Sequence, residues 1–474
     1  MNPTRLIRYH ITLLQLEQYN LGRYFAVLRK RYAILADMRQ QAVWTAKLKV
    51  IVGCATIAII ATIAIIFNAL GALMALAAAL MSLLSFPLYL AFAVLLTAPL
   101  DLFLKRRIIR KAKLKLARFP AVKIIGITGS YGKTTMKEVA RAILAERFAV
   151  LATPESVNTP VGIARLILEK LSEDIKILII EMGAYRTGDI RALCAITPPN
   201  IAVLTGINEA HIERFGNIAN TVSAKFEIAR HAKPDAVIIL NAEDKRVRNE
   251  YEKHCGGRTV IFYGERAEDL PRYGITDTRF EQDGLRQSFT LTNAHGAAYQ
   301  LSTPLLGDYA PATIMGAVCV AETLGMTRTE ITHGVVMIRP VAHRLQPFTT
   351  ANGVLVIDDS YNGNPDGARE AIRVLARFKN RRKLYVTPGL VEMGAKNAEI
   401  HRMIGADLAS VADIIILIKN TATVFIAEGL KNAGFRNQNI FWFKNAMEAH
   451  AALPATLKNG DVVLFQNDWP DNYL

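Results

Sequence analysis

The fold is decided by residues Val122–Thr135, which read Val-Lys-Ile-Ile-Gly-Ile-Thr-Gly-Ser-Tyr-Gly-Lys-Thr-Thr. A largely apolar, β-branched run of strand length breaks into a loop that holds Gly129 and Gly132, and a helical pattern begins near Lys133. Glycines let backbone N–H groups close around phosphate oxygens, a helix N-terminus adds positive potential, and a lysine supplies a point charge. The stretch therefore predicts a strand, a phosphate-binding loop and a helix.

The loop has the shorter Gly-x-x-Gly-Lys-Thr form, because Ile127 stands where the strict phosphate-loop pattern has a glycine. The Thr134 hydroxyl can ligate Mg²⁺ in such a loop. The helix that follows carries one apolar stripe at helical spacing, formed by Met136, Val139, Ala140, Ile143 and Leu144. An ordinary strand-to-helix turn that happens to contain Gly-Lys-Thr is the alternative.

The composition indicates a membrane segment and argues against a nucleic-acid partner. Hydrophobic residues make up 51% of the 474-residue chain, and the mean hydropathy is +0.20, which is high for a purely soluble protein. Residues 1–120 hold 17 Lys and Arg against 3 Asp and Glu, whereas the rest holds 40 basic and 38 acidic residues. The net charge of +16 therefore belongs to the N-terminal segment. The 4 cysteines lack a C-x-x-C spacing, so neither a disulfide framework nor a zinc site is expected.

The apolar stretch from Val50 to Leu100 contains no Asp, Glu, Lys or Arg. At roughly 20 residues per spanning helix, it predicts a transmembrane helical hairpin of two crossings with a turn near Asn68–Gly71. Both flanks are basic, so both ends are expected in the cytoplasm, with the basic residues against anionic membrane lipids. The predicted location is the inner (plasma) membrane, multi-pass, with cytoplasmic catalytic domains. Residues 1–47 fit either an amphipathic helix on the membrane surface or a plain solvated helix.

Beyond the phosphate loop, short apolar strands alternate with helices, which predicts an α/β fold with a doubly wound parallel sheet. Strands are expected at Ile177–Ile180, Ile201–Leu204, Ala236–Leu240 and Thr259–Tyr263. Residues 275–305 predict a small β insertion, and a second, Rossmann-like alternation without a phosphate loop restarts after Gly353. The predicted domains are the N-terminal helix and hairpin at 1–120, the phosphate-loop domain at 121–339 and a C-terminal domain at 340–474.

Polar side chains follow three neighbouring strands where the strands end. They are Glu181, Asn208, His211, Asn241 and Asp244. Ligands gather at the carboxyl ends of strands in such sheets, so a carboxylate and an imidazole there predict a Mg²⁺ site beside the loop. A helix cap or surface turn is the alternative for each residue taken alone.

These motifs resemble the Mur ligase family of ATP-dependent ligases, which join an amino acid or peptide to a carboxylate. The resemblance runs from Val122 to about Phe465. Its further motifs are Glu181-Met-Gly-Ala, Asn208-Glu-Ala-His211, Ala224-Lys225, Asn241-Ala-Glu-Asp, His343-Arg344-Leu and Asp358-Asp-Ser-Tyr-Asn-Gly-Asn-Pro-Asp366. The last is most similar to the branch of the family that adds a D-alanyl-D-alanine dipeptide.

The resemblance implies a role for each matching residue. The ATP ligands would be Gly129, Ser130, Tyr131, Gly132, Lys133, Thr134, Thr135, Asn241, Arg344 and Asp359. Thr134 and Glu181 would hold one Mg²⁺, and His211 with a carbamylated Lys225 a second; a salt-bridging lysine is the alternative for Lys225. The catalytic set would be Lys133, His211, Lys225 and Arg344, and substrate would contact Asn158, Asn362, Asn364 and Asp366.

The implied reaction activates a carboxylate of a cell-wall precursor as an acyl phosphate, which an amino acid or dipeptide amine then attacks. Mg²⁺ and Lys133 would offset the repulsion between the anionic acceptor and the triphosphate. Three alternatives stay open: a Mur-like ligase for another, membrane-presented acceptor, a membrane-tethered ATPase, and a module that binds nucleotide without turnover.

The chain also departs from the family pattern. A membrane hairpin replaces the usual N-terminal domain, and Gly206 stands where an asparagine commonly precedes the histidine motif. Gly307–Thr313 lacks the asparagine that helps to hold the nucleotide base, and Gln466-Asn-Asp replaces a Lys-Gly-Ser near the end. The acceptor's identity therefore does not follow from the sequence.

Overall fold

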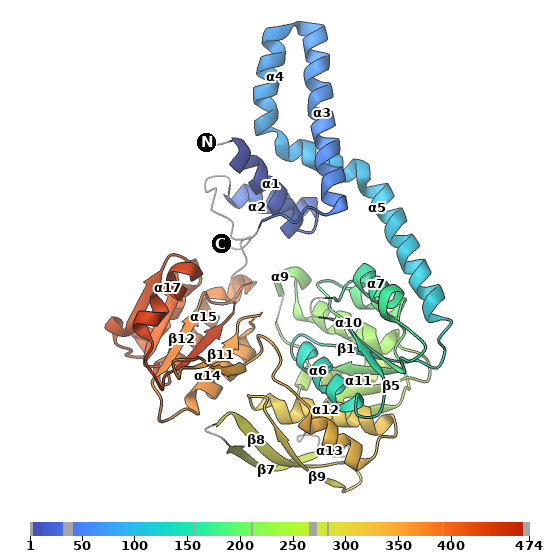
Figure 1. Ribbon diagram of the computed structural model, residues 1–474, viewed down its shortest axis with the longest axis vertical. Helices are drawn as coiled ribbons and strands as arrows, with labels where there is room; N and C mark the ends of the chain where they lie inside the picture. Colours follow the sequence, from blue (N-terminus) through green and yellow to red (C-terminus); the bar gives the residue numbers. More distant parts are fainter. Residues whose placement is uncertain are drawn as a thin grey trace. The chain divides into compact units, whose positions relative to one another are not determined.

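The computed structural model describes residues 3–31, 41–154, 157–209, 212–264, 273–281, 284–361, 363–391 and 393–467 (Figure 1). The chain divides into two compact units, and the boundary in the sequence falls between Arg107 and Ile108. The three-domain division at residues 120 and 339 remains a prediction.

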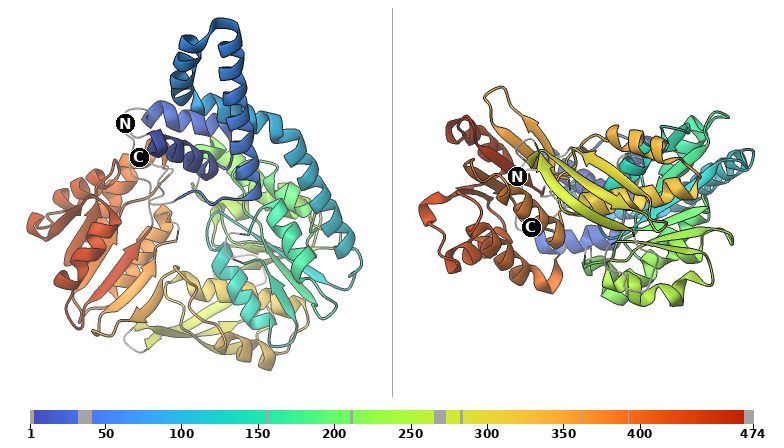
Figure 2. Two further views of the ribbon diagram at one scale, coloured as in Figure 1. Left: turned by 45° about the horizontal axis from the view of Figure 1, so that its top comes forward. Right: turned by 90° about the horizontal axis from the view of Figure 1, so that it is seen from below.

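The N-terminal unit is helical. Its helices are α1 (Pro3–Leu16), α2 (Leu21–Arg31), α3 (Ala46–Leu70), α4 (Ala72–Leu84) and α5 (Phe86–Leu116), of which α5 continues past the unit boundary. The expected turn is present, because α3 ends at Leu70 and Gly71 takes a φ of 82°. Figure 2 shows α3 and α4 as a hairpin. Helices α3 and α5 are long and apolar enough to cross a membrane by length and composition.

The sequence predicts one helix in residues 1–47, and the described residues 3–31 form two, α1 and α2. Their apolar sides are buried: Leu13 and Leu14 of α1 and Tyr24 of α2 pack in one cluster with Leu48 and Ile51 of α3. Helices α1 and α2 therefore form a platform at the base of α3 rather than a solvated helix.

The phosphate-loop domain is built on a parallel sheet of order β2-β3-β1-β4-β5-β6, which confirms the doubly wound prediction. Its strands are β1 (Lys123–Thr128), β2 (Val150–Ala152), β3 (Ile177–Glu181), β4 (Ile201–Leu204), β5 (Val237–Asn241) and β6 (Val260–Tyr263). Successive residues face opposite sides, so Ile124 and Ile125 enter different cores. The helices are α6 (Lys133–Leu144), α7 (Pro160–Lys170), α8 (Asp189–Cys194), α9 (Ile212–Phe215), α10 (Ile218–Arg230), α11 (Lys245–Cys255), α12 (Tyr309–Thr323) and α13 (Arg328–Val336).

The predicted β insertion is a three-stranded antiparallel sheet. It consists of β7 (Gly274–Glu281), β8 (Arg286–Thr292) and β9 (Ala298–Thr303), and α13 packs against β9 (Figure 1).

The C-terminal sheet has the order β10-β11-β15-β12-β13-β14, in which only β10 is antiparallel. The strands are β10 (Gln346–Thr349), β11 (Leu355–Asp359), β12 (Lys383–Thr387), β13 (Ile414–Ile418), β14 (Ile440–Phe443) and β15 (Val462–Gln466). The helices are α14 (Pro365–Ala376), η2 (Gly394–Lys396), α15 (Asn397–Ala409), α16 (Thr423–Asn432), η3 (Asn437–Asn439) and α17 (Ala446–Thr456). The alternation of strands and helices that is expected after Gly353 is present, and the two edge strands and α17 were not predicted.

Candidate active site

The phosphate loop joins β1 to α6 as predicted, and its backbone requires glycine at two points. Gly129 has a φ of 154°, and a Cβ there would lie 2.1 Å from Thr205 Oγ1. Gly132 has a φ of 72° and forms the N-cap of α6. A side chain at either position would strain the loop, so glycine is needed for this backbone path. The Ser130 N–H donates to the Gly206 carbonyl oxygen over 2.8 Å, which ties the loop to the end of β4.

Lys133 lies against the loop itself. Its Nζ donates a hydrogen bond to the Gly129 carbonyl oxygen over 2.8 Å. Burial lowers the pKa of the Lys133 amine, while the nearby Glu181 carboxylate opposes that shift. The amine is thus held at the mouth of the loop, where a phosphate oxygen can replace the carbonyl as its partner.

Thr134 and Glu181 meet as the sequence predicts. The Thr134 hydroxyl donates to Glu181 Oε1 over 3.2 Å, and both residues line one pocket. A hydroxyl and a carboxylate are oxygen donors of the kind that Mg²⁺ prefers, so the pair fits the implied ion. Within the described ranges, no group of three His, Cys, Asp or Glu side chains is placed to hold a metal, and His211 lies outside the described residues.

Lys137 is a neighbour of this pair that sequence reasoning missed. Its side chain is fully buried, and its Nζ lies 3.4 Å from Glu181 Oε2 and 3.4 Å from Glu138 Oε1. A buried ammonium needs a nearby carboxylate, so Lys137 holds the side of Glu181 that faces away from Thr134. The signal was a lysine one helical turn after Lys133, on the buried face of α6.

Lys225 is buried on α10 and lines the same pocket. Burial lowers its pKa well below the ordinary value, and the positive charge of Lys133 adds to the effect. Its Nζ lies 5.7 Å from the centroid of the Phe215 ring. The nearby Glu227 is already engaged, because it accepts from the backbone N–H groups of Gly188 and Arg191 at 2.6 and 2.9 Å.

Tyr131 explains why glycine occupies position 206. A Cβ on Gly206 would lie 2.1 Å from the Tyr131 hydroxyl oxygen and 2.2 Å from Cζ of its ring. That hydroxyl donates to Asp244 Oδ2 over 3.1 Å. Asp244 Oδ2 also accepts a hydrogen bond from the Ile207 N–H over 2.6 Å. The ring therefore fills the space that a side chain at position 206 would need, and Asp244 ties the phosphate loop to the end of β4.

Asn241 does not line this pocket. Its Nδ2 donates to the Thr205 carbonyl oxygen over 2.9 Å, and its Oδ1 accepts from the Glu243 N–H over 3.0 Å. Its amide therefore holds the turn after β5, and its predicted contact with nucleotide stays a prediction.

Arg344 reaches the pocket from the C-terminal domain. Its guanidinium carbon lies 4.4 Å from the centroid of the Tyr361 ring, which lines the pocket too. Both residues beside Arg344 are left-handed, with φ 56° at His343 and 45° at Leu345. Such backbone strain costs of order 1–3 kcal/mol per residue and clusters at functional sites.

Asp359 lies behind Arg344. Burial raises the pKa of its carboxyl to about 7, and Arg344 and the Leu345 N–H oppose the shift. That N–H donates to Asp359 Oδ1 over 3.2 Å. Asp359 therefore braces the strained turn; its predicted contact with the ribose is untested.

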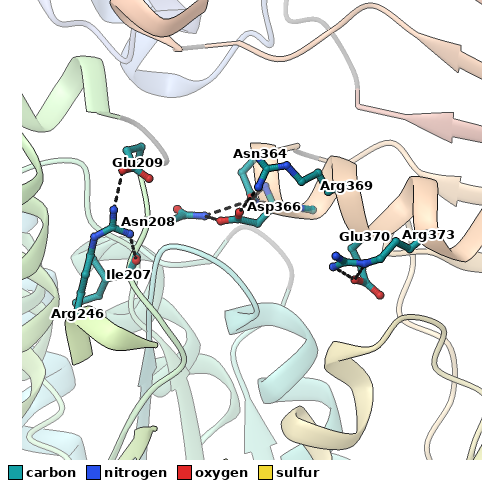
Figure 3. Close-up of polar contacts among 10 residues, drawn as sticks. Ile207, Asn208, Glu209, Arg246, Asn364, Asp366, Arg369, Glu370 and Arg373 are labelled. Atoms are coloured by element: carbon teal, nitrogen blue, oxygen red, sulfur yellow. Dashed lines mark hydrogen bonds and ion pairs between the residues drawn. The ribbon is translucent and has the colours of Figure 1, made fainter. Parts of the chain in front are cut away.

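Asn208 joins the two α/β domains. Its Nδ2 donates to Asp366 Oδ2 over 2.8 Å and to Asn364 Oδ1 over 3.2 Å (Figure 3). Asn364 is also the N-cap of α14 and accepts from the backbone N–H groups of Asp366 and Gly367. The predicted substrate residues Asn364 and Asp366 thus lie at the contact between the domains; Asn362 lies outside the described residues.

The C-terminal tail has a comparable role in the C-terminal domain. Asn467 Oδ1 accepts from the Gly363 N–H over 2.8 Å, and its Nδ2 donates to the Gly389 carbonyl oxygen over 2.5 Å. Asn467 belongs to the stretch that departs from the family pattern. It therefore joins the loop at Gly363 to the loop at Gly389.

The structure gathers most of the predicted residues around one pocket. Those that line it are Ser130, Tyr131, Gly132, Lys133, Thr134, Thr135, Asn158, Glu181, Lys225, Arg344 and Asn364. The lining also includes Tyr185, Tyr361, Val391 and Met393, which sequence reasoning missed. Gly129, Asp359 and Asp366 lie in the surrounding structure.

Comparison with known proteins identifies two family profiles in the chain. "Mur ligase middle domain" matches residues 127–321, and "Mur ligase, glutamate ligase domain" matches residues 343–466. The UDP-N-acetylmuramoyl-tripeptide–D-alanyl-D-alanine ligase of Escherichia coli is 28% identical over 71% of this chain and 75% of its own length. The same ligase of Haemophilus influenzae is 30% identical over 66% of this chain and 67% of its own length.

Solved structures give the same result. The MurF ligase from Thermotoga maritima in complex with ADP superposes with a TM-score of 0.67 at 27% identity, covering 77% of this chain and 80% of that one. A MurF crystal structure from Acinetobacter baumannii has a TM-score of 0.68 at 25% identity, with 78% of each chain covered.

Proposed function

The chain belongs to the Mur ligase family of ATP-dependent, amide-bond-forming ligases, and we propose that it attaches D-alanyl-D-alanine to the tripeptide carboxylate of a peptidoglycan precursor while anchored to a membrane. One observation carries the proposal: the phosphate loop and Arg344 of the C-terminal domain line a single pocket. An acceptor carboxylate and a triphosphate can then meet between the two domains.

In the proposed mechanism, the loop N–H groups and Lys133 bind the ATP phosphates. Thr134 and Glu181 would hold Mg²⁺, which supplies charge neutralisation at the γ-phosphate when bound. Arg344 would reach the γ-phosphate from the C-terminal domain. The acceptor carboxylate attacks the γ-phosphate, which gives an acyl phosphate and ADP. The incoming amine then displaces phosphate and forms the amide bond. No side-chain nucleophile is needed, because positioning and electrostatic stabilisation lower the barrier.

We assign Lys225 to carbamylation. An amine with a lowered pKa is uncharged for a larger share of the time, and only the uncharged amine adds to CO₂. The product is a carboxylate-like oxygen ligand, which would suit a second Mg²⁺ beside His211. The remaining predicted positions, Asn158, Asn364 and Asp366, would contact the acceptor or the dipeptide.

We further propose that the N-terminal unit anchors the enzyme at the inner membrane, with the α/β domains on the cytoplasmic side. Most exposed side chains of the hairpin are apolar, among them Ile57, Ile65, Leu73, Leu76 and Leu80, and the polar residues Thr56 and Asn68 are exposed as well. Lys105 and Arg106 follow as basic residues suited to anionic head groups.

A panel of acceptors and amines tests the ligase assignment. The full chain is supplied with ATP, Mg²⁺ and each pairing of muropeptide precursors with amino acids or dipeptides, and the products are identified by mass spectrometry. The expected product is the pentapeptide precursor, formed only when tripeptide and D-alanyl-D-alanine are both present. Lys133→Ala is expected to abolish this product while the chain still sediments with membranes.

A second candidate is a Mur-type ligase for an acceptor presented at the bilayer. It is favoured by the family profiles, which begin only at residue 127, after the apolar helices. A lipid-linked precursor in the same panel distinguishes the two: preference for it over the soluble tripeptide would replace the first assignment.

A further inference from the structure

The free part of the α3–α4 hairpin is short. Ala55 is the last buried residue of α3, so the arms that project beyond the helical platform are Thr56–Leu70 and Ala72–Leu84. At about 1.5 Å per residue, these arms are roughly 22 and 20 Å long. The hydrocarbon core of a bilayer is about 30 Å thick. The projecting hairpin therefore falls short of the far side by roughly 8–10 Å.

The base of the hairpin cannot easily follow the arms into hydrocarbon. Leu48, Ile51 and Ala55 pack against α1, α2 and the first turns of α5. Helix α1 carries Arg5 and Arg8 on its exposed side. Placing an arginine at the centre of a bilayer costs about 2.5–3.5 kcal/mol on insertion scales, so the platform is expected to stop at the head groups.

Helix α5 does not extend the second arm. Helix α4 ends at Leu84, with Ser85 as its C-cap, and packs along α3. Helix α5 begins at Phe86, runs past the base of the hairpin and then points away from it (Figures 1 and 2). One side of its first turns is buried against the base through Phe86 and Leu90, and Leu88 and Phe92 are exposed on the other. A helix with this division suits the membrane interface, lying along it.

The tip is mainly apolar, and Asn68 is its exposed polar residue. Leu70 is 62% exposed and Leu73 is 79% exposed, on either side of Gly71. A hairpin that emerged from the far face would place these leucines in the aqueous phase. The free-energy cost of this exposure is about 25 cal/mol for each Å² of apolar surface. The tip is more stable inside the hydrocarbon.

From these lengths and contacts we propose that the α3–α4 hairpin is re-entrant: it enters the cytoplasmic leaflet, turns at Gly71 within the bilayer and returns. The chain would then hold to one face of the membrane without crossing it, in place of the two crossings that the sequence predicts. The inference rests on the proposed membrane anchoring and specifies its depth and topology.

The re-entrant topology is tested by the accessibility of a thiol placed at the tip of the hairpin. The full chain carries Leu73→Cys in a Cys54→Ala background, and spheroplasts and inverted membrane vesicles are treated with a membrane-impermeant maleimide. A thiol within hydrocarbon is expected to stay unmodified in both preparations and to react once detergent is added. Arg106→Cys is the control for the cytoplasmic side and should react only in inverted vesicles.

A lengthened hairpin is the matched control. Seven apolar residues added to each arm extend it by about 10 Å, enough to reach the far side, so Leu73→Cys in that variant should react in spheroplasts. Reaction of the unlengthened Leu73→Cys chain in spheroplasts would show a crossing hairpin and overturn the inference, while anchoring stands. Recovery of the full chain in the soluble fraction would instead refute the anchoring, and the inference with it. Leu70→Cys repeats the test if Leu73→Cys does not accumulate.

Discussion

Replacing Gly206 by alanine should displace the phosphate loop, because the space beside Gly206 is already filled. The new Cβ would lie 2.1 and 2.2 Å from the Tyr131 hydroxyl oxygen and Cζ, whereas ordinary contacts begin near 3.4 Å. Either the tyrosine or the turn after β4 must therefore move by about 1 Å. Overpacking of this kind costs about 1–3 kcal/mol, and the φ of 156° at Gly206 adds strain of order 1–3 kcal/mol.

The functional effect follows from the position of Tyr131 inside the loop. A misplacement of about 1 Å can reduce turnover by about 10²-fold, so we expect Gly206→Ala to lower kcat/KM for ATP by that order. Nucleotide affinity is measured by titration calorimetry with ADP, and stability by thermal unfolding. Gly257→Ala is the matched control, because its φ is 74° and nothing lies within 4 Å of its added Cβ. It should cost about 1 kcal/mol of stability and leave ADP binding unchanged.

A second substitution tests the cause. Tyr131→Ala removes the obstructing ring, so the double variant should bind ADP more tightly than Gly206→Ala alone, with a coupling free energy of about 1–3 kcal/mol. Tyr131→Phe removes the hydroxyl and its hydrogen bond to Asp244 but keeps Cζ, which would still lie 2.2 Å from the new Cβ, so most of the clash should remain. Additive effects of Tyr131→Ala and Gly206→Ala would refute the reasoning.

Three further changes probe other parts of the site. Asn208→Ala removes both hydrogen bonds to Asn364 and Asp366, worth about 1 kcal/mol or slightly more, so kcat/KM should fall roughly fivefold to tenfold while the Tm falls by only about 2–4 °C. Unchanged kinetics would exclude a role for this contact. Lys225→Gln should lower the ligation rate by about 10²-fold and remove any stimulation of that rate by bicarbonate. Stimulation that persists in this variant would show that carbamylation occurs at another residue. Asp359 has a folded pKa raised to about 7, so the folded state binds the proton more tightly, and stability should fall as pH rises from about 4 to 7. Asp359→Asn should therefore gain stability over the wild type between pH 5 and pH 8, by up to about 4 kcal/mol, in urea unfolding; a pH-independent difference would contradict the assigned pKa.

Features that depend on neighbouring residues were predictable from the sequence. The strand, loop and helix around Lys133 follow from hydrophobic spacing and two glycines, and the structure places them as expected. The hairpin turn at Gly71 and the three-strand insertion were likewise local patterns. Strands β10 and β14 were missed because each is a four-residue segment at a sheet edge, too short and too exposed for a clear alternation.

Features that depend on distant residues could not be predicted in the same way. Gly206 looked like a departure from a family pattern, and only the folded chain shows that Tyr131, far away in sequence, occupies the missing side chain's space. The contact of Asn208 with Asp366 joins residues 158 positions apart. Lys137 was hidden for a different reason, since a lysine on a helix usually indicates a solvated face.

The most direct test of the central claim is the ratio of ADP released to amide formed by the full chain under single-turnover and steady-state conditions. If triphosphate at the Lys133 loop activates the acceptor carboxylate, one ADP should appear for each amide bond, and omission of the acceptor or the amine should reduce ADP release to background. ADP release that continues unchanged without acceptor and amine would contradict the ligase and favour a tethered ATPase.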